Sequence, residues 1–263
     1  MQVITSKENE IIKNIKKLKD KKYRDEQNKF IVEGIKMLQE AIDEKAIIDK
    51  IVVCEECVSD GTIGQDLLYE IAKHDCIYTS KKVFESITEV TNPQGILAVM
   101  QKENGEDNIS YEEDVIVVLD GIQDPGNLGT ILRTIDSVNL KQVILSETTA
   151  DPYNPKVVRS TMGAIYRVNM IRSKNIIETL KNIKKHKYEI VATSLQTDKS
   201  IYDIDYKKKV IVIGNEANGV SKEVLDLANT KVKIPMLGKT ESLNAAVATG
   251  IILYEYVRTN LKK

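Results

Sequence analysis

The segment Asp120-Gly-Ile-Gln-Asp-Pro-Gly-Asn-Leu-Gly129 decides how this chain folds. It follows the apolar run Val115-Ile-Val-Val-Leu119, which is typical of a parallel strand buried on both faces. A helical pattern over Leu128–Val138 comes next, with Asn127 as its expected N-cap and Arg133 near its start. Because ligands of open α/β sheets bind at the carboxyl ends of the strands, this segment predicts a binding loop.

Two later segments repeat this design at the ends of further strands. Gly214-Asn-Glu-Ala-Asn-Gly219 follows the apolar run Val210–Ile213, and Ile234-Pro-Met-Leu-Gly-Lys-Thr-Glu-Ser-Leu-Asn244 leads into the last helix. Gly214 and Gly238 are expected to let the backbone approach a ligand closely. Each loop alone fits ordinary turn chemistry, but three such loops at adjacent strand ends indicate one shared site. The sequence has neither a G-x-G-x-x-G fingerprint nor a P-loop, which disfavours dinucleotide and nucleoside triphosphate binding.

Strand and helix patterns alternate along the chain, which predicts an α/β protein of two domains. Residues 102–113 are polar and acidic, as is typical of a linker, so we expect a small domain over 1–101 and a larger one over 114–263. Strands are expected at 29–33, 48–54, 76–78, 96–100, 115–119, 142–145, 189–192, 210–213 and 232–234. Helices are expected at 6–20 with Ser6 as N-cap, after Gly34, and at 65–73, 128–138, 173–186, 222–228 and 243–257.

Composition narrows the class of protein. Hydrophobic residues make up 42% and charged residues 29% of the 263 residues, which excludes a disordered or fibrous chain. With 38 Lys and Arg against 39 Asp and Glu, nucleic-acid binding would depend on local basic patches. We expect no membrane span and no signal peptide, since long apolar stretches are missing. An odd count of 3 Cys favours reduced thiols in a cytoplasmic protein.

A basic cluster near the N-terminus leaves two interpretations open. Its members are Lys16, Lys17, Lys21, Lys22 and Arg24. They form either a solvated helix face, which is the commoner case, or a patch that contacts nucleic-acid phosphates.

The cysteines raise a second alternative. Cys54-Glu-Glu-Cys57 has the spacing of a zinc site, and His74 and Cys76 follow it. Cys54 and Cys76 also lie at the ends of apolar strands, where buried thiols are common. We therefore expect no metal.

The three loops together resemble the three motifs of the SpoU–TrmH family of RNA 2′-O-ribose methyltransferases, in the SPOUT superfamily. Leu119 to Arg133 resembles motif one, Gly214-x-Glu216-x-x-Gly219 resembles motif two, and Ile234 to Asn244 resembles motif three, in family order and spacing. The resemblance covers about residues 113–259. The first half, especially Lys29-Phe-Ile-Val-Glu-Gly34, resembles over a shorter stretch the ribosomal-protein-L30e-like substrate-binding domain of rRNA-modifying members.

The resemblance implies a parallel sheet with a deep trefoil knot that holds S-adenosylmethionine. By position, it implies cofactor contacts at Thr193, Gly214, Ile234 and Leu243. It implies a catalytic set made of Arg133, Asn127, Glu216, Ser242 and Asn244. In the family a partner subunit supplies the arginine, so the resemblance also implies a homodimer.

The function implied is methylation of a ribose 2′-OH in RNA, with 23S rRNA as the first expectation. DNA is excluded because it lacks the 2′-OH. The basic cluster would then contact RNA phosphates. The alternatives are a tRNA 2′-O-methyltransferase, an antibiotic-resistance methylase of the same fold, and a non-catalytic RNA-binding ribosome-assembly factor. The complete catalytic set argues against the last of these.

Overall fold

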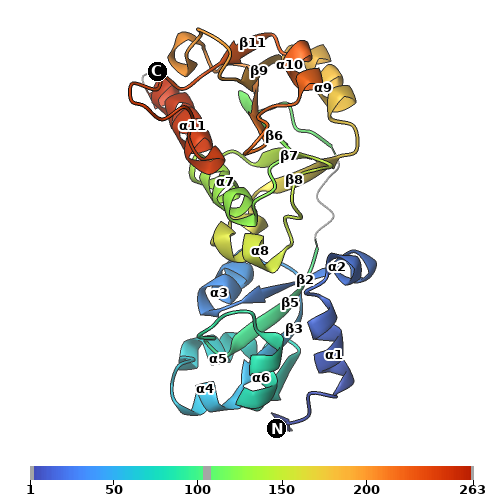
Figure 1. Cartoon of the computed structure of the whole chain (residues 1–263). Helices are drawn as coiled ribbons and strands as arrows, with labels where there is room; N and C mark the ends of the chain where they lie inside the picture. Colours follow the sequence, from blue (N-terminus) through green and yellow to red (C-terminus); the bar gives the residue numbers. More distant parts are fainter. Residues whose placement is uncertain (1–2, 103–107, 262–263) are drawn as a thin grey trace. The chain divides into compact units, whose positions relative to one another are not determined.

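The computed structural model describes residues 3–102 and 108–261 of the chain. It separates into two compact units, which are described one at a time (Figure 1). Unit 1 comprises Met1–Glu103 and Tyr153–Tyr166, and unit 2 comprises Asn104–Pro152 and Arg167–Lys263. Part of the predicted linker over 102–113 lies outside the described residues.

Unit 1 is built on a five-stranded mixed sheet in the order β1-β4-β3-β5-β2. Its strands are β1 (Val3–Ile4), β2 (Lys29–Glu33), β3 (Ile48–Cys54), β4 (Cys76–Thr79) and β5 (Ile96–Gln101). Its helices are α1 (Glu10–Lys17), α2 (Lys21–Gln27), α3 (Ile35–Asp43), α4 (Glu55–Ser59), α5 (Gln65–Ile71), α6 (Lys81–Ile87) and α8 (Pro155–Thr161), followed by the 3-10 turn η1 (Ala164–Tyr166). Apolar side chains of α1, α6, β2, β3 and β5 form one buried cluster between sheet and helices.

Helix α8 comes to unit 1 from a distant part of the sequence and packs against the edge strand β2. The ring of Tyr153 lies on that of Phe30, with 4.8 Å between ring centroids. The hydroxyl of Tyr166 donates to the carbonyl of Met37 across 3.3 Å. These long-range contacts are why residues 153–166 belong to unit 1, whereas the sequence prediction had assigned them to the second domain.

Unit 2 is built on a six-stranded parallel sheet in the order β11-β9-β10-β6-β7-β8. Its strands are β6 (Val115–Asp120), β7 (Gln142–Ser146), β8 (Asn169–Ser173), β9 (Glu189–Thr193), β10 (Lys209–Gly214) and β11 (Thr230–Val232). Its helices are α7 (Pro125–Ser137), α9 (Ile176–Lys185), α10 (Lys222–Leu227) and α11 (Ala245–Leu261), with the 3-10 turn η2 (Ile201–Asp203). Helix α7 packs against α11, and α9 packs against α10 (Figure 1).

The register of the central strands brings the predicted loops to one edge of this sheet. Asp120 at the end of β6 pairs with Gly214 at the end of β10. Val232 at the end of β11 pairs with Thr193 at the end of β9. Strands β6 and β10 are buried along their whole length, as their continuous apolar runs predict. The loops that follow these strands therefore start from a rigid, apolar base.

The predicted α/β fold with a parallel sheet is confirmed, while the knot stays a prediction. Most predicted elements are present with shifted ends, and β11 ends at Val232 instead of starting there. The elements that had not been predicted include β1, β8, α2, α4, α6 and α8. Helix α1 has Asn9, not Ser6, as its N-cap. Within the described ranges, no helix combines the length and the apolar character that a membrane span requires.

The predicted N-cap of α7 is wrong. Helix α7 starts at Pro125 with Asp124 as its N-cap, and the Asp124 carboxylate accepts from the backbone N–H of Asn127 across 2.8 Å. Proline suits the first helical position because it has no N–H that would need a partner there. The side chain of Asn127 is therefore available for other contacts.

Candidate active site

A cavity of about 470 Å³ opens at the carboxyl edge of the parallel sheet of unit 2. Its walls come from the ends of β9, β10 and β11, from the loop before α11 and from the first turns of α11. Cavities of roughly 300–1,000 Å³ are typical of small-molecule sites. The size and the mixed polar and apolar walls fit a cofactor as large as a nucleoside derivative.

All four residues predicted to contact the cofactor line this cavity. They are Thr193, Gly214, Ile234 and Leu243. The Thr193 hydroxyl donates to the carbonyl of Val212 across 3.1 Å, so this side chain is held within the sheet. Most of the other lining residues lie in loops, whose backbone can offer N–H and C=O groups to an uncharged ring.

The two loop glycines have different roles. A Cβ at Gly214 would lie 2.0 Å from the backbone nitrogen of Val220 and 2.1 Å from the carbonyl carbon of Gly219. The neighbour that requires glycine at this position is therefore the chain's own turn, not a ligand. A Cβ at Gly238 would meet no heavy atom within 4 Å.

Glu216 joins motif two to the loop of motif one. Its Oε1 accepts from the side-chain Nδ2 of Asn127 across 2.9 Å and from the backbone N–H of Asp124 across 3.1 Å. Its Oε2 accepts from the backbone N–H of Gln123 across 3.1 Å. Three donors therefore fix this carboxylate at the rim of the cavity.

Burial opposes ionisation of Glu216, but these hydrogen bonds outweigh it and hold the pKa of its carboxyl below the ordinary value of 4.5. The carboxylate is therefore ionised at neutral pH. A carboxylate with a lowered pKa is a weak base. Its position suits it to orient Asn127 rather than to take a proton.

Asn244 adds motif three to the same network. Its Nδ2 donates to Oδ1 of Asn127 across 2.8 Å. Its own Oδ1 accepts from the backbone N–H groups of Ala246 and Val247 across 2.9 and 3.3 Å, which caps the start of α11. The amide of Asn127 is thus oriented from both sides, by Glu216 and by Asn244.

The other two members of the catalytic set are exposed. Ser242 lies in the loop before α11 and lines the cavity. Arg133 lies on α7 outside the cavity lining. Across the described residues, no carboxylate or carbonyl makes a hydrogen bond or ion pair with the Arg133 guanidinium. The structure therefore joins Asn127, Glu216 and Asn244 by hydrogen bonds and places Ser242 in the same cavity lining as Glu216 and Asn244. Arg133 lies outside that lining.

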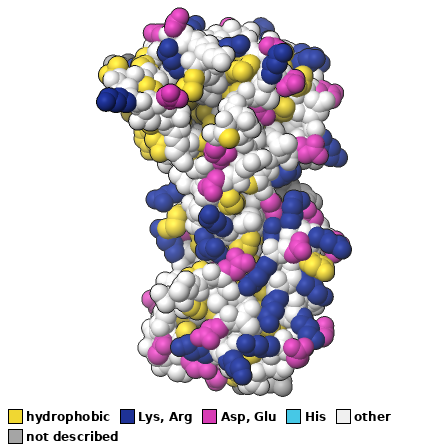
Figure 2. Space-filling model, viewed as in Figure 1, with side chains coloured by type: hydrophobic (Ala, Val, Ile, Leu, Met, Phe, Trp, Pro, Cys, Tyr) yellow, Lys and Arg dark blue, Asp and Glu magenta, His cyan; other side chains and the backbone are white. Residues whose placement is uncertain are grey.

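The basic cluster of unit 1 keeps four of its five predicted members on the surface. Lys17, Lys21 and Lys22 are exposed, and Lys16 is partly exposed. Lys21 and Lys22 form ion pairs with Asp25 and Glu26 one helical turn away. Figure 2 shows Lys and Arg side chains interleaved with acidic ones over the visible face of the protein.

Arg24 was predicted to contact RNA, and this prediction is wrong. Its side chain is only 2% exposed. The guanidinium donates to the backbone carbonyls of Leu18 and Lys19 across 2.9 and 2.7 Å. Because these carbonyls follow the end of α1, Arg24 stabilises the α1–α2 connection.

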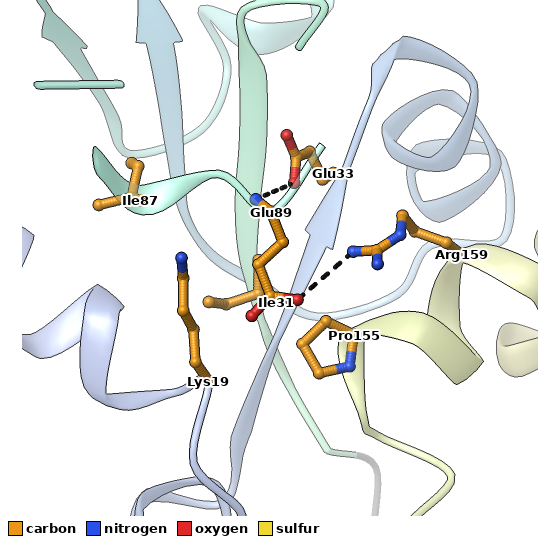
Figure 3. A pocket seen from close by; sticks show the side chains of 7 residues that line it. All are labelled: Lys19, Ile31, Glu33, Ile87, Glu89, Pro155 and Arg159. Carbon is orange, nitrogen blue, oxygen red and sulfur yellow. Dashed lines mark hydrogen bonds and ion pairs between the residues drawn. The ribbon is translucent and has the colours of Figure 1, made fainter. Parts of the chain in front are cut away.

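A small hollow in unit 1 lies between β2, α6 and α8 (Figure 3). Arg159 of α8 forms an ion pair with Glu89 across 3.7 Å, and the backbone N–H of Glu89 donates to Glu33 across 3.4 Å. The hollow measures about 10 Å³. That volume holds about one water molecule, so the hollow is no ligand site.

The cysteines pack as thiols. Cys54 is buried, and burial raises the pKa of its thiol to about 12. Burial likewise raises the pKa of the Cys76 thiol to about 11. In the part of the chain that the structure describes, His, Cys, Asp and Glu form no group of three that could hold a metal ion.

Several residues of the site had not been predicted. Asp120 accepts from the backbone N–H of Ser221 across 2.8 Å, and Thr149 donates to the carbonyl of Leu119 across 3.0 Å. Asn215 donates to the carbonyl of Gly121 across 2.8 Å. Asp120 could have been predicted from its position directly after a buried apolar run. Asn215 could have been predicted from its position directly before Glu216. No local signal pointed to Thr149.

Comparison with known proteins gives the class of protein. The model of the SpoU rRNA methylase family matches residues 114–254, and that of the MRM3-like substrate binding domain matches residues 9–98. This chain belongs to the SpoU rRNA methylase family, as the motifs predicted. It is 33% identical to the 23S rRNA (guanosine(2553)-2'-O)-methyltransferase RlmP of Bacillus subtilis, over 97% of this chain and 98% of that protein.

Two solved structures extend this similarity to the whole fold. The AdoMet-bound rRNA methyltransferase from Sinorhizobium meliloti is 32% identical, with a TM-score of 0.84 over 98% of each chain. The SpoU methyltransferase AviRb from Streptomyces viridochromogenes, in complex with the cofactor AdoMet, is 25% identical. Its TM-score is 0.85, over 97% of this chain and 100% of AviRb.

Proposed function

We propose that this chain methylates a ribose 2′-OH of 23S rRNA, with S-adenosylmethionine as the methyl donor. The observation that carries the proposal is the joining of three motif loops at one cavity. Glu216 and Asn244 line that cavity, and Asn127 is hydrogen-bonded to both. The similarity over nearly the whole chain to a protein named as a 23S rRNA 2'-O-methyltransferase supports the same conclusion.

The cavity fits S-adenosylmethionine. Thr193, Gly214, Ile234 and Leu243 would hold it, mostly through backbone groups and apolar contacts. When bound, the cofactor supplies a methyl group on a positively charged sulfur. Two solved relatives, from Sinorhizobium meliloti and Streptomyces viridochromogenes, are described with this cofactor bound.

The polar residues at the rim would position the ribose. Asn127, fixed by Glu216 and Asn244, presents an amide of defined orientation. Ser242 offers a hydroxyl from the cavity lining, which also includes Glu216 and Asn244. Holding a nucleophile in line with its target can lower a barrier by roughly 7–11 kcal/mol without any other chemistry.

Arg133 would bind the RNA phosphate and stabilise the negative charge that develops on the 2′-oxygen. A guanidinium keeps its proton under physiological conditions, so it serves poorly as a base. Its planar N–H donors can bind two phosphate oxygens at once, and they can stabilise the negative charge that develops on an oxygen. These two properties favour the role of clamp over the role of base.

A second copy of this chain would supply Arg133 to the cavity, as the family resemblance implies. Arg133 lies on α7, which packs against α11. Val247 and Tyr254 of α11 are 51% and 54% exposed, and their spacing puts them on one face of that helix. Exposed apolar side chains on the helix that packs against the helix of Arg133 suit a homodimer interface.

Lys16, Lys17, Lys21 and Lys22 of unit 1 would contact RNA phosphates. These lysines lie on α1 and α2, within the region that matches the substrate-binding domain. Specificity for RNA over DNA would come from the 2′-OH, which is itself the methyl acceptor.

The experiment supplies radiolabelled S-adenosylmethionine to the purified protein with unmodified rRNA or with bulk tRNA in separate reactions. Label in rRNA alone is the expected result. Label in tRNA alone would make the protein a tRNA enzyme. If the protein binds the cofactor but labels neither RNA nor ribosome-assembly intermediates, it would be a non-catalytic binding factor.

A further inference from the structure

Asn215 makes more contacts at the site than any sequence motif indicated. Its Nδ2 donates to the backbone carbonyl of Gly121 across 2.8 Å. Its Oδ1 accepts from the backbone N–H groups of Ala217 and Asn218, each across 3.0 Å. One planar amide therefore holds its own turn with its oxygen and the loop of motif one with its nitrogen.

The backbone of Asn215 fixes the same turn. Its N–H donates to the carbonyl of Gly219, and its carbonyl accepts from the N–H of Gly219, each across 2.9 Å. The turn is therefore closed before its side chains meet any substrate. Within the described residues, Asn215 is the only residue of this turn whose side chain donates a hydrogen bond to a distant part of the sequence.

Gly121 is held on its other side as well. Its N–H donates to the hydroxyls of Ser146 and Thr149 across 2.9 and 3.2 Å. Its φ is +80°, a conformation in which glycine is favoured. The peptide groups on either side of Gly121 are thus fixed, one by hydroxyls of β7 and its loop and the other by Asn215.

Asn215 and Glu216 act on successive parts of one loop. Asn215 holds Gly121, and Glu216 accepts from the N–H groups of Gln123 and Asp124. If the bond of Asn215 were lost, the turn could shift along the loop. Glu216 would then lose its alignment with Asn127.

We propose that Asn215 is a positioning residue for methyl transfer, which sets the register of the motif-two turn against the motif-one loop and so keeps Glu216 on Asn127. This inference rests on the proposed function. The role needs an amide, because one group must donate to Gly121 and also accept from the turn.

Two substitutions remove the donor and keep the acceptor. In Asn215→Asp a carboxylate still accepts from the turn but repels the carbonyl of Gly121. In Asn215→Ser a short hydroxyl can still accept within the turn but does not span the distance to Gly121. Agreement between a charged and a neutral variant separates loss of the donor from an effect of charge. The matched controls are Asn182→Asp and Asn182→Ser, on the exposed surface of α9 and outside the cavity lining.

The first readout needs no RNA. Hydrogen exchange of the cofactor-free protein, followed by mass spectrometry, reports the amides of residues 121–124. We expect faster exchange there in both Asn215 variants, and exchange like that of the wild type in both controls. Unchanged exchange in folded Asn215 variants would overturn the inference.

The second readout is kinetic. We expect kcat to fall at least about tenfold in both Asn215 variants, with the KM for RNA and the Kd for S-adenosylmethionine changed by less than about threefold. A wild-type kcat, or an equal loss of cofactor affinity, would overturn the positioning role. If the wild-type protein methylates no RNA, the proposed function fails, and the exchange result still decides whether Asn215 holds the loop.

Discussion

The side-chain nitrogen of Asn244 lies 2.8 Å from the side-chain oxygen of Asn127, which connects the start of α11 to the start of α7. The same Asn127 donates to Glu216. Three loops that are far apart in the sequence therefore meet through one amide. The orientation of the Asn127 amide is set by Glu216 and Asn244, and the motifs name these residues without giving the hydrogen bonds between them.

Asn244 has two separable roles, and two substitutions distinguish them. Asn244→Ala removes the cap of α11 and should destabilise the protein by about 1 kcal/mol. Asn244→Asp keeps a good capping acceptor but loses the donor to Asn127. We expect its stability to stay close to that of the wild type while its kcat falls with that of the alanine variant. Urea denaturation and steady-state kinetics measure the two effects, and equal stability losses in both variants would contradict the separation.

Gly214→Ala should destabilise the protein by about 1–3 kcal/mol or more, because the added Cβ would overlap the backbone of the turn at Gly219 and Val220. Gly238→Ala is the control, since a Cβ there meets open space. We expect its effect to stay within about 0.5 kcal/mol. Thermal unfolding of the two variants gives the comparison, and similar melting temperatures would refute the steric argument.

Glu216→Gln tests the charge at the rim. The folded-state pKa of Glu216 is lowered, so its ionised form stabilises the protein above pH 4.5, the ordinary value, and this contribution is lost as the pH falls through the folded pKa. The stability difference between wild type and Glu216→Gln should be constant above that value and shrink below it. Because the carboxylate is solvent-exposed, we expect at most about 1 kcal/mol. Urea titrations from neutral to acid pH measure it, and a difference that grows on acidification would disprove the assignment.

The basic cluster of unit 1 makes a prediction about salt. Replacing Lys16, Lys17, Lys21 and Lys22 by Gln should weaken RNA binding and lower the slope of log K against log salt by about 1–3. The expected change is smaller than four because Lys21 and Lys22 form ion pairs with Asp25 and Glu26, so they contribute less to phosphate binding. The control replaces four other exposed lysines of unit 1, which are Lys45, Lys73, Lys81 and Lys82. An unchanged slope in the first variant, or equal slopes in both, would remove the cluster from the RNA site.

Arg133→Ala should abolish methylation while changing the Kd for S-adenosylmethionine by less than about threefold, because Arg133 lies outside the cavity lining. Calorimetry measures cofactor binding, and the radiolabel assay measures methylation. Mixing Arg133→Ala with an inactive Asn127→Ala variant should restore part of the activity if the arginine comes from a second copy. No recovery in mixtures that exchange subunits would place the arginine in its own cavity.

The sequence predicted the parts of the fold that local patterns control. Strands β6 and β10 follow from continuous apolar runs, and the polar loops after them follow from the rule that sites lie at carboxyl strand ends. The cap of α7 was misassigned because Asn127 is a good capping residue, while the Asp124-Pro125 pair starts the helix one turn earlier. With Asn127 assigned as the cap, its side chain was not expected to be free for hydrogen bonds with Glu216 and Asn244.

Contacts between separate helices and strands explain two further differences. Arg24 looked like its lysine neighbours, but its side chain is buried and donates to the backbone carbonyls that follow α1. Helix α8 lies between strands of unit 2 in the sequence, yet it packs on β2 of unit 1. Neither outcome follows from periodicity, because Arg24 is buried by the turn between two helices and α8 by a strand far away in the sequence.

The most direct test of the central claim is the chemical position of the transferred methyl group. Unmodified 23S rRNA is incubated with the protein and S-adenosylmethionine, digested to nucleosides and analysed by mass spectrometry. We predict a single 2′-O-methyl nucleoside, absent when Arg133→Ala replaces the wild type. A methyl group on a base, or an equal yield of the 2′-O-methyl nucleoside with Arg133→Ala, would contradict the site described for this chain.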